Sequence, residues 1–160
     1  MRDTATPQAI LDFWFEDALD QPDKLGQRMK VWFGGGPKVD AEITERFGST
    51  VAVLGSGLAD MWATRGPRER LAAIIALDQF SRSIHRKSPK AFVNDPLALH
   101  LAKEGIAKGE DQQLPPAARM FVYLPLYMQG VLGMSAAASG MLFVPMIFAM
   151  ITASVASGQI

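Results

Sequence analysis

The chain has 160 residues, no cysteine and a formal net charge of zero, from 16 basic and 16 acidic residues. All of these charges lie in residues 1–119, and residues 120–160 carry none. A balanced charge argues against a nucleic-acid partner, which would require clustered Lys and Arg. The lack of cysteine excludes a disulfide scaffold and thiol chemistry.

Signals for helix starts and stops follow one another along the charged part of the chain. Thr6-Pro7 is typical of a helix N-cap followed by proline at the first helical position. Apolar residues at helical spacing, bounded by Gly and Pro, predict further helices at 23–33, about 38–54, 67–87, 94–109 and from 114 onward. No sustained alternation of apolar and polar residues indicates a strand. The sequence therefore predicts an all-α fold, an antiparallel helical array with short loops.

The most polar part of an otherwise apolar helix is the segment 77–86, which holds the candidate ligand-binding residues Asp78, Gln79, Arg82, His85 and Arg86. Asp78 and Arg82 are four residues apart, as are Arg82 and Arg86, so each pair can share one helix face. Two guanidinium groups on one face would suit a carboxylate or phosphate. The alternative is a purely structural ion pair with a second arginine that anchors a loop.

Metal and cofactor sites are not expected. His85 has no second His or Cys at ligand spacing, and His100 lies in another predicted helix. Asp78 and Asp95 could form a carboxylate pair, but no sequence signal brings them together. Asp95 is better interpreted as a helix cap before Pro96. The Trp14-Phe15 and Trp32-Phe33 pairs are expected in the core rather than in a ligand cage.

Several motifs occur together in a fixed order. They are ILDFWF at 10–15, the Trp32-Phe33 pair, residues 40–47, LDQFSRSI at 77–84, residues 91–99 and LPPAARMFVYLP at 114–125. In these motifs, residues 1–126 resemble the bacterial domain-of-unknown-function 924 family. The resemblance implies a tetratricopeptide-like helical fold and no known reaction. Family members continue with further helices after the Tyr-Leu-Pro motif, so we expect 1–126 to be a C-terminally truncated domain.

The uncharged residues after 119 carry a different signal. Residues 136–157 have no charge, and about 20 apolar residues span the hydrocarbon core of a bilayer. We favour a membrane-type helix here over a buried core helix. The motifs LPLYMQGVLGMS at 124–135, SGML at 139–142 and PM at 145–146 resemble multidrug efflux transporters of the major facilitator superfamily over 123–160. One helix and a fragment cannot build a transport site between two bundles, so no transport activity is expected.

These two resemblances suggest a chimera joined near 123–126, with a helical domain at 1–126 and an apolar tail at 127–160. We expect 1–119 to be cytoplasmic, with inner-membrane association through 136–157. The leading functional hypothesis is a non-enzymatic helical binding module with an Arg-rich polar groove for a protein or a small anionic ligand. One alternative is a small-molecule enzyme, in which Arg82 and Arg86 hold an anion and His85 or Asp78 moves a proton. Another is a membrane-associated transporter fragment.

Overall fold

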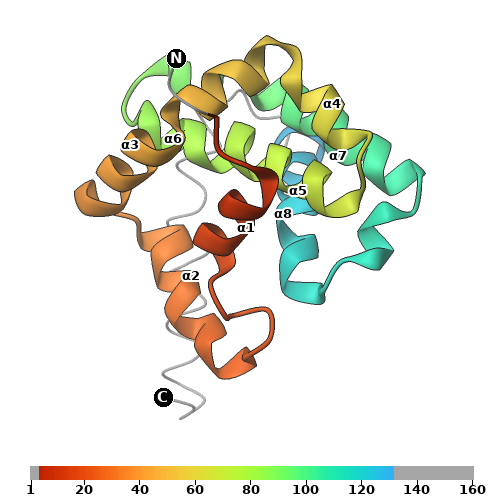
Figure 1. Ribbon diagram of the computed structural model, residues 1–160, viewed down its shortest axis with the longest axis horizontal. Helices are drawn as coiled ribbons and strands as arrows, with labels where there is room; N and C mark the ends of the chain where they lie inside the picture. Colours follow the sequence, from red (N-terminus) through yellow and green to blue (C-terminus); the bar gives the residue numbers. More distant parts are fainter. Residues whose placement is uncertain (1–3, 132–160) are drawn as a thin grey trace.

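The computed structural model describes residues 4–131, and every regular element in this range is a helix (Figure 1). The α-helices are α1 (Pro7–Phe15), α2 (Leu25–Gly34), α3 (Pro37–Val53), α4 (Ala59–Ala63), α5 (Pro67–Ile75), α6 (Ser81–Ile84), α7 (Asp95–Ala107) and α8 (Pro116–Leu126). Short 3-10 turns are η1 (Pro22–Lys24), η4 (Pro89–Phe92) and η5 (Glu110–Gln113), and π-helical turns are η2 (Leu54–Leu58), η3 (Ala76–Phe80) and η6 (Tyr127–Val131). The predicted all-α class is confirmed for this range.

Most of the predicted helix starts are confirmed, because they rest on local chemistry. Thr6 caps α1, and its hydroxyl accepts a hydrogen bond from the Ala9 amide at 3.2 Å. Proline occupies the first turn of α1, α3, α5, α7 and α8, where its missing N–H costs nothing. Gly36 and Gly66 precede α3 and α5 at φ values of 136° and 151°, a backbone conformation open mainly to glycine.

The core joins α1, α2 and α8 through aromatic rings. The Phe121 ring lies with its centroid 5.5 Å from Trp14, 5.6 Å from Phe15 and 5.0 Å from Trp32, in edge-to-face arrangements. All four side chains are buried. Phe33, the remaining member of the two predicted pairs, packs against this core while partly buried. The aromatic pairs are therefore core residues, as predicted.

One continuous helical rod runs from Pro67 to Ile84 and is made of α5, η3 and α6, with right-handed helical backbone at both junctions. Its α5 part contacts α1, α4, α7 and α8, and its α6 part contacts α3. In Figure 1, α1 and α5 lie near the middle of the view, with α2 and α3 to one side and α4 and α7 to the other. The rod carries the candidate site where η3 passes into α6.

No helix within residues 4–131 is both long and apolar enough to cross a membrane. The membrane-type helix predicted at 136–157 lies outside the described residues.

Candidate functional site

Arg82 of α6 is the centre of a charged cluster. Its Nη1 atom lies 2.8 Å from Asp78 Oδ1 and also donates to the Asp78 main-chain oxygen. Its Nη2 atom lies 3.1 Å from Oδ2 of Asp95, the first residue of α7. One guanidinium thus bridges two carboxylates that come from different helices. We call these three residues the Arg82 cluster.

The carboxylates of the Arg82 cluster lie beneath the guanidinium. The side chains of Asp78 and Asp95 are each 4% exposed, whereas that of Arg82 is 26% exposed. One face of the guanidinium covers the Phe92 ring, 5.4 Å from its centroid. The cluster therefore combines a partly exposed arginine side chain with two buried carboxylates.

Two further hydrogen bonds hold the cluster in place, and one carboxylate oxygen of Asp95 makes no hydrogen bond within residues 4–131. Gln79 Nε2 donates to Asp78 Oδ2 at 2.5 Å, and Gln129 Nε2 donates to the Asp95 main-chain oxygen at 3.1 Å. Both carboxylate oxygens of Asp78 thus accept a hydrogen bond. Asp95 Oδ1 is buried and accepts none from any described residue.

Burial raises the pKa of Asp95 to about 6 from an ordinary value of 3.8. The neighbouring Arg82 charge acts in the opposite direction, while the Asp78 charge raises the pKa further. Carboxyl groups with raised pKa values cluster at functional sites, and they also occur in structural ion-pair networks. The π-helical turn η3, which holds Asp78 and Gln79, is another such feature, because π-turns occur frequently at functional sites.

Arg86 and His85 lie outside this arrangement. Arg86 forms a two-pronged ion pair with Asp40 near the start of α3, at 2.5 Å from Nε to Oδ2 and 2.7 Å from Nη2 to Oδ1. These hydrogen bonds lower the pKa of Asp40 and raise that of Arg86. The two arginines are thus engaged by different helices, α7 for Arg82 and α3 for Arg86. No side-chain contact of His85 with Asp78 or either arginine is found among the described residues.

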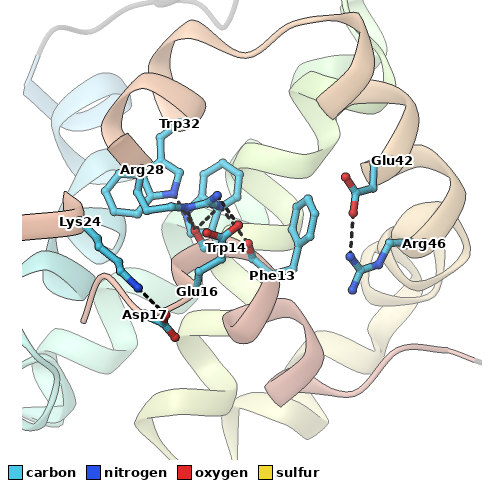
Figure 2. A network of polar contacts seen from close by, with 9 residues as sticks. All are labelled: Phe13, Trp14, Glu16, Asp17, Lys24, Arg28, Trp32, Glu42 and Arg46. Atoms are coloured by element: carbon cyan, nitrogen blue, oxygen red, sulfur yellow. Dashed lines mark hydrogen bonds and ion pairs between the residues drawn. The ribbon is translucent and has the colours of Figure 1, made fainter. Parts of the chain in front are cut away.

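Two other arginines show what a structural arginine looks like in this fold. Arg28 is buried and donates to the Trp14 main-chain oxygen at 2.7 Å and the Phe13 main-chain oxygen at 2.9 Å, so that it caps the end of α1 (Figure 2). Its carboxylate partner, Glu16, is 63% exposed. Arg70 is also buried, and it donates to the main-chain oxygens of Ala63 and Leu101 and to Glu104 and Glu110. In both cases the arginine is inside and its acidic partners lie further out, which is the reverse of the Arg82 cluster.

A small pocket of about 120 Å³ lies elsewhere, between the starts of α1 and α5. Its lining residues are Thr6, Pro7, Gln8, Leu11, Arg65, Arg68 and Glu69. None of them belongs to the predicted site, and the pocket does not support it. Over residues 4–131, no group of three or more His, Cys, Asp or Glu side chains is placed to hold a metal ion.

The residue that the sequence interpretation missed is Asp95. We interpreted it as a helix cap, but Asn94 occupies the N-cap of α7, and no side-chain hydrogen bond among the described residues caps this helix. The Asp95 carboxylate turns to Arg82 instead, and it comes within reach of the same guanidinium as Asp78. The sequence contains no signal for this contact, because it depends on how α7 packs on η3.

These features define an all-α protein with a buried acidic pair beneath one partly exposed arginine. The chain matches the family described as "Bacterial protein of unknown function (DUF924)" over residues 10–139, and it belongs to this family. A solved structure of a protein of unknown function from Agrobacterium tumefaciens is similar, with 32% sequence identity and a TM-score of 0.63. The similarity covers 75% of this chain and 62% of that one, so the chain spans less than two thirds of that protein. No curated protein matches the chain.

The family match extends past residue 126, to 139. The predicted boundary at that residue stays a prediction. The comparisons give no support to the transporter resemblance over 123–160 or to a chimeric origin.

The raised pKa of Asp95 predicts a specific pH dependence of stability. The folded state binds this proton more tightly than the unfolded state, so stability is gained as the pH falls through about 6 and is lost as it rises. Asp95→Asn removes this effect. We expect the free energy of unfolding of the wild type, relative to Asp95→Asn, to be higher at pH 4.5 than at pH 7.5 by about 2 kcal/mol. Urea unfolding of both proteins at both pH values measures this effect. A stability difference between wild type and Asp95→Asn that is the same at both pH values would contradict the raised pKa of Asp95.

Proposed function

We propose that the protein is a non-enzymatic helical binding module of the tetratricopeptide-like kind, and that Arg82 contacts a small anionic ligand carrying a carboxylate or phosphate. The reversed burial of the Arg82 cluster carries this proposal. Arg28 and Arg70 are buried and donate to main-chain oxygens of other helices. Arg82 also donates to a main-chain oxygen, that of Asp78. In contrast to Arg28 and Arg70, its side chain is partly exposed, its two carboxylate partners are buried and it lies over Phe92.

The hydrogen bonds of Arg82 leave donors available. Nη1 serves Asp78 and Nη2 serves Asp95, while no hydrogen bond from Nε to a described residue is found. A guanidinium whose position is fixed by its partners loses less entropy when it binds an anion. The anion contact is therefore placed at Arg82 and not on an Arg82–Arg86 pair, since the two arginines are held by different helices, Arg82 by Asp95 of α7 and Arg86 by Asp40 of α3.

A thermal-shift screen with carboxylates and phosphate esters at pH 6 tests the proposal. Bound ligand raises the Tm by mass action. Arg82→Ala leaves two buried carboxylates without a cation, so Arg82→Lys is the better test: it keeps the charge and loses the planar fork. We expect at least one anion to raise the Tm of the wild type. The same rise in Tm for Arg82→Lys should require an anion concentration about tenfold higher.

The matched control is Arg46→Ala, which removes another partly exposed arginine, paired with Glu42. Its ligand response should equal that of the wild type. An anion that stabilises Arg82→Lys and wild type equally would show that Arg82 does not contact it. A full panel without any stabilising anion would refute the proposed ligand class.

A small-molecule enzyme using the same cluster is the second candidate. The observation that favours it is the raised pKa of Asp95 beside a guanidinium, which suits a group that transfers a proton near neutral pH. In this version Asp95 takes the role that the sequence analysis gave to His85 or Asp78. Any anion found in the screen should then be followed for chemical change, and turnover that Asp95→Asn abolishes would favour the enzyme.

A further inference from the structure

The Arg82 cluster has one positive and two negative groups in a buried setting. When all three are ionised, the cluster carries an excess negative charge, and burying such a charge is costly. An incoming anion would meet this excess charge directly behind Arg82. It would also find one of the two N–H groups of Nη2 donating to Asp95.

The structure distinguishes the two carboxylates. Both oxygens of Asp78 accept hydrogen bonds, from Arg82 and Gln79. Asp95 accepts one from Arg82 on Oδ2, and its buried Oδ1 accepts none from the described residues. A proton added to the cluster therefore binds to Oδ1 of Asp95, because no hydrogen-bond donor among the described residues occupies this oxygen. The neutral carboxyl group attracts the guanidinium less strongly, which frees Nη2.

We propose that the Arg82 cluster takes up an anion together with one proton from water, which binds to Asp95 as the anion binds to Arg82. This inference rests on the proposed function. Proton uptake removes the excess negative charge and releases donors of Arg82 for the anion. Affinity for an anion should then increase as the pH falls.

The groups around Asp95 support this assignment. The charged groups that act on it are Arg82 on α6 and Asp78 on η3. From η6 the uncharged Gln129 amide contacts its main chain. Arg70 on α5, the buried charged side chain of that helix, is paired with Glu104 and Glu110 towards the other end of α7. Asp95 is thus the group of this cluster that can gain a proton without breaking another ion pair.

Isothermal titration calorimetry with sulfate tests the inference, because sulfate keeps its charge between pH 5 and pH 8. For a pKa of about 6, the Kd of the wild type should be about 30-fold weaker at pH 7.5 than at pH 5. Asp95→Asn carries a neutral side chain of the same size, so its Kd should stay nearly constant over this range. At pH 7.5 it should bind sulfate more tightly than the wild type.

Glu42→Gln is the control, since Glu42 is a carboxylate paired with the surface Arg46. It should keep the pH profile of the wild type and so show that the loss of a negative charge elsewhere has no such effect. Equal pH profiles for wild type and Asp95→Asn would overturn the proton coupling but leave anion binding by Arg82 intact.

A ligand-free measurement separates the two proposals. The NMR signal of the Arg82 Nε–H group should shift between pH 5 and pH 7.5 in the wild type and stay in place in Asp95→Asn. If this signal titrates while sulfate binds no variant at any pH, the anion-binding function is wrong and coupled uptake falls with it. If sulfate binds but the signal does not titrate, only the proton coupling is wrong.

Discussion

Phe121→Ala is expected to lower the free energy of unfolding by about 4 kcal/mol, the largest loss among the substitutions considered. Phe121 is 1% exposed, and its ring contacts Trp14, Phe15 and Trp32 from α1 and α2. The substitution would leave a cavity at the point where α1, α2 and α8 meet. Urea unfolding followed by tryptophan fluorescence measures the effect, since Trp14 and Trp32 line that cavity.

Tyr127→Ala is the matched control for this prediction, because Tyr127 is an aromatic residue close by in the chain with 48% exposure. Its loss should stay below about 1 kcal/mol, as for most surface substitutions. A loss for Phe121→Ala no larger than that of the control would mean that the three helices do not share one core.

Arg70→Ala is expected to lower the free energy of unfolding by about 3 kcal/mol. The side chain of Arg70 is 3% exposed and links α4, α7 and η5 to α5 through Ala63, Leu101, Glu104 and Glu110. Its removal leaves two buried main-chain oxygens without these donors. Arg70→Lys should recover only part of the loss, since one ammonium group cannot reach all four partners.

Arg46→Ala serves as the control for Arg70→Ala, because the Arg46–Glu42 pair is a surface pair with both side chains nearly half exposed. Such a pair contributes about 0.5 kcal/mol. Thermal and chemical unfolding of Arg70→Ala, Arg70→Lys and Arg46→Ala can be compared directly. Near-equal stabilities of Arg70→Ala and Arg46→Ala would show that the buried network does not join these elements.

Features that depend on neighbours in sequence could be predicted. The start of α1 at Thr6-Pro7 and the ion pair between Asp78 and Arg82 each lie within one helical turn. α4 was not predicted, because its five residues, Ala59–Ala63, are too few to show a periodic pattern.

Features that depend on tertiary packing could not be predicted. Arg82 reaches Asp95 across 13 residues, and Arg86 reaches Asp40 across 46. The carbonyl contacts of Arg28 and Arg70 are equally hidden, because every residue has a main-chain oxygen and the sequence cannot say which one lies nearby. Of the residues that meet in this cluster, the sequence singled out Asp78, Gln79 and Arg82 but not Asp95, and their role in binding a ligand stays a prediction.

The loss of charge after Arg119 also has a partial structural explanation. Residues 120–126 belong to α8, and Ala118, Phe121, Val122 and Pro125 of that helix are buried. The uncharged stretch begins within the family match over 10–139. For α8, core packing accounts for the apolar residues, and no membrane contact is needed.

The most direct test of anion binding at Arg82 is an NMR titration of the backbone amides of the wild type with sulfate at pH 5.5. The account predicts that the largest shifts appear at residues 78–82 and 92–95. Shifts concentrated instead at Asp40 and Arg86, or at Thr6, Arg65 and Arg68 around the separate pocket, would contradict it.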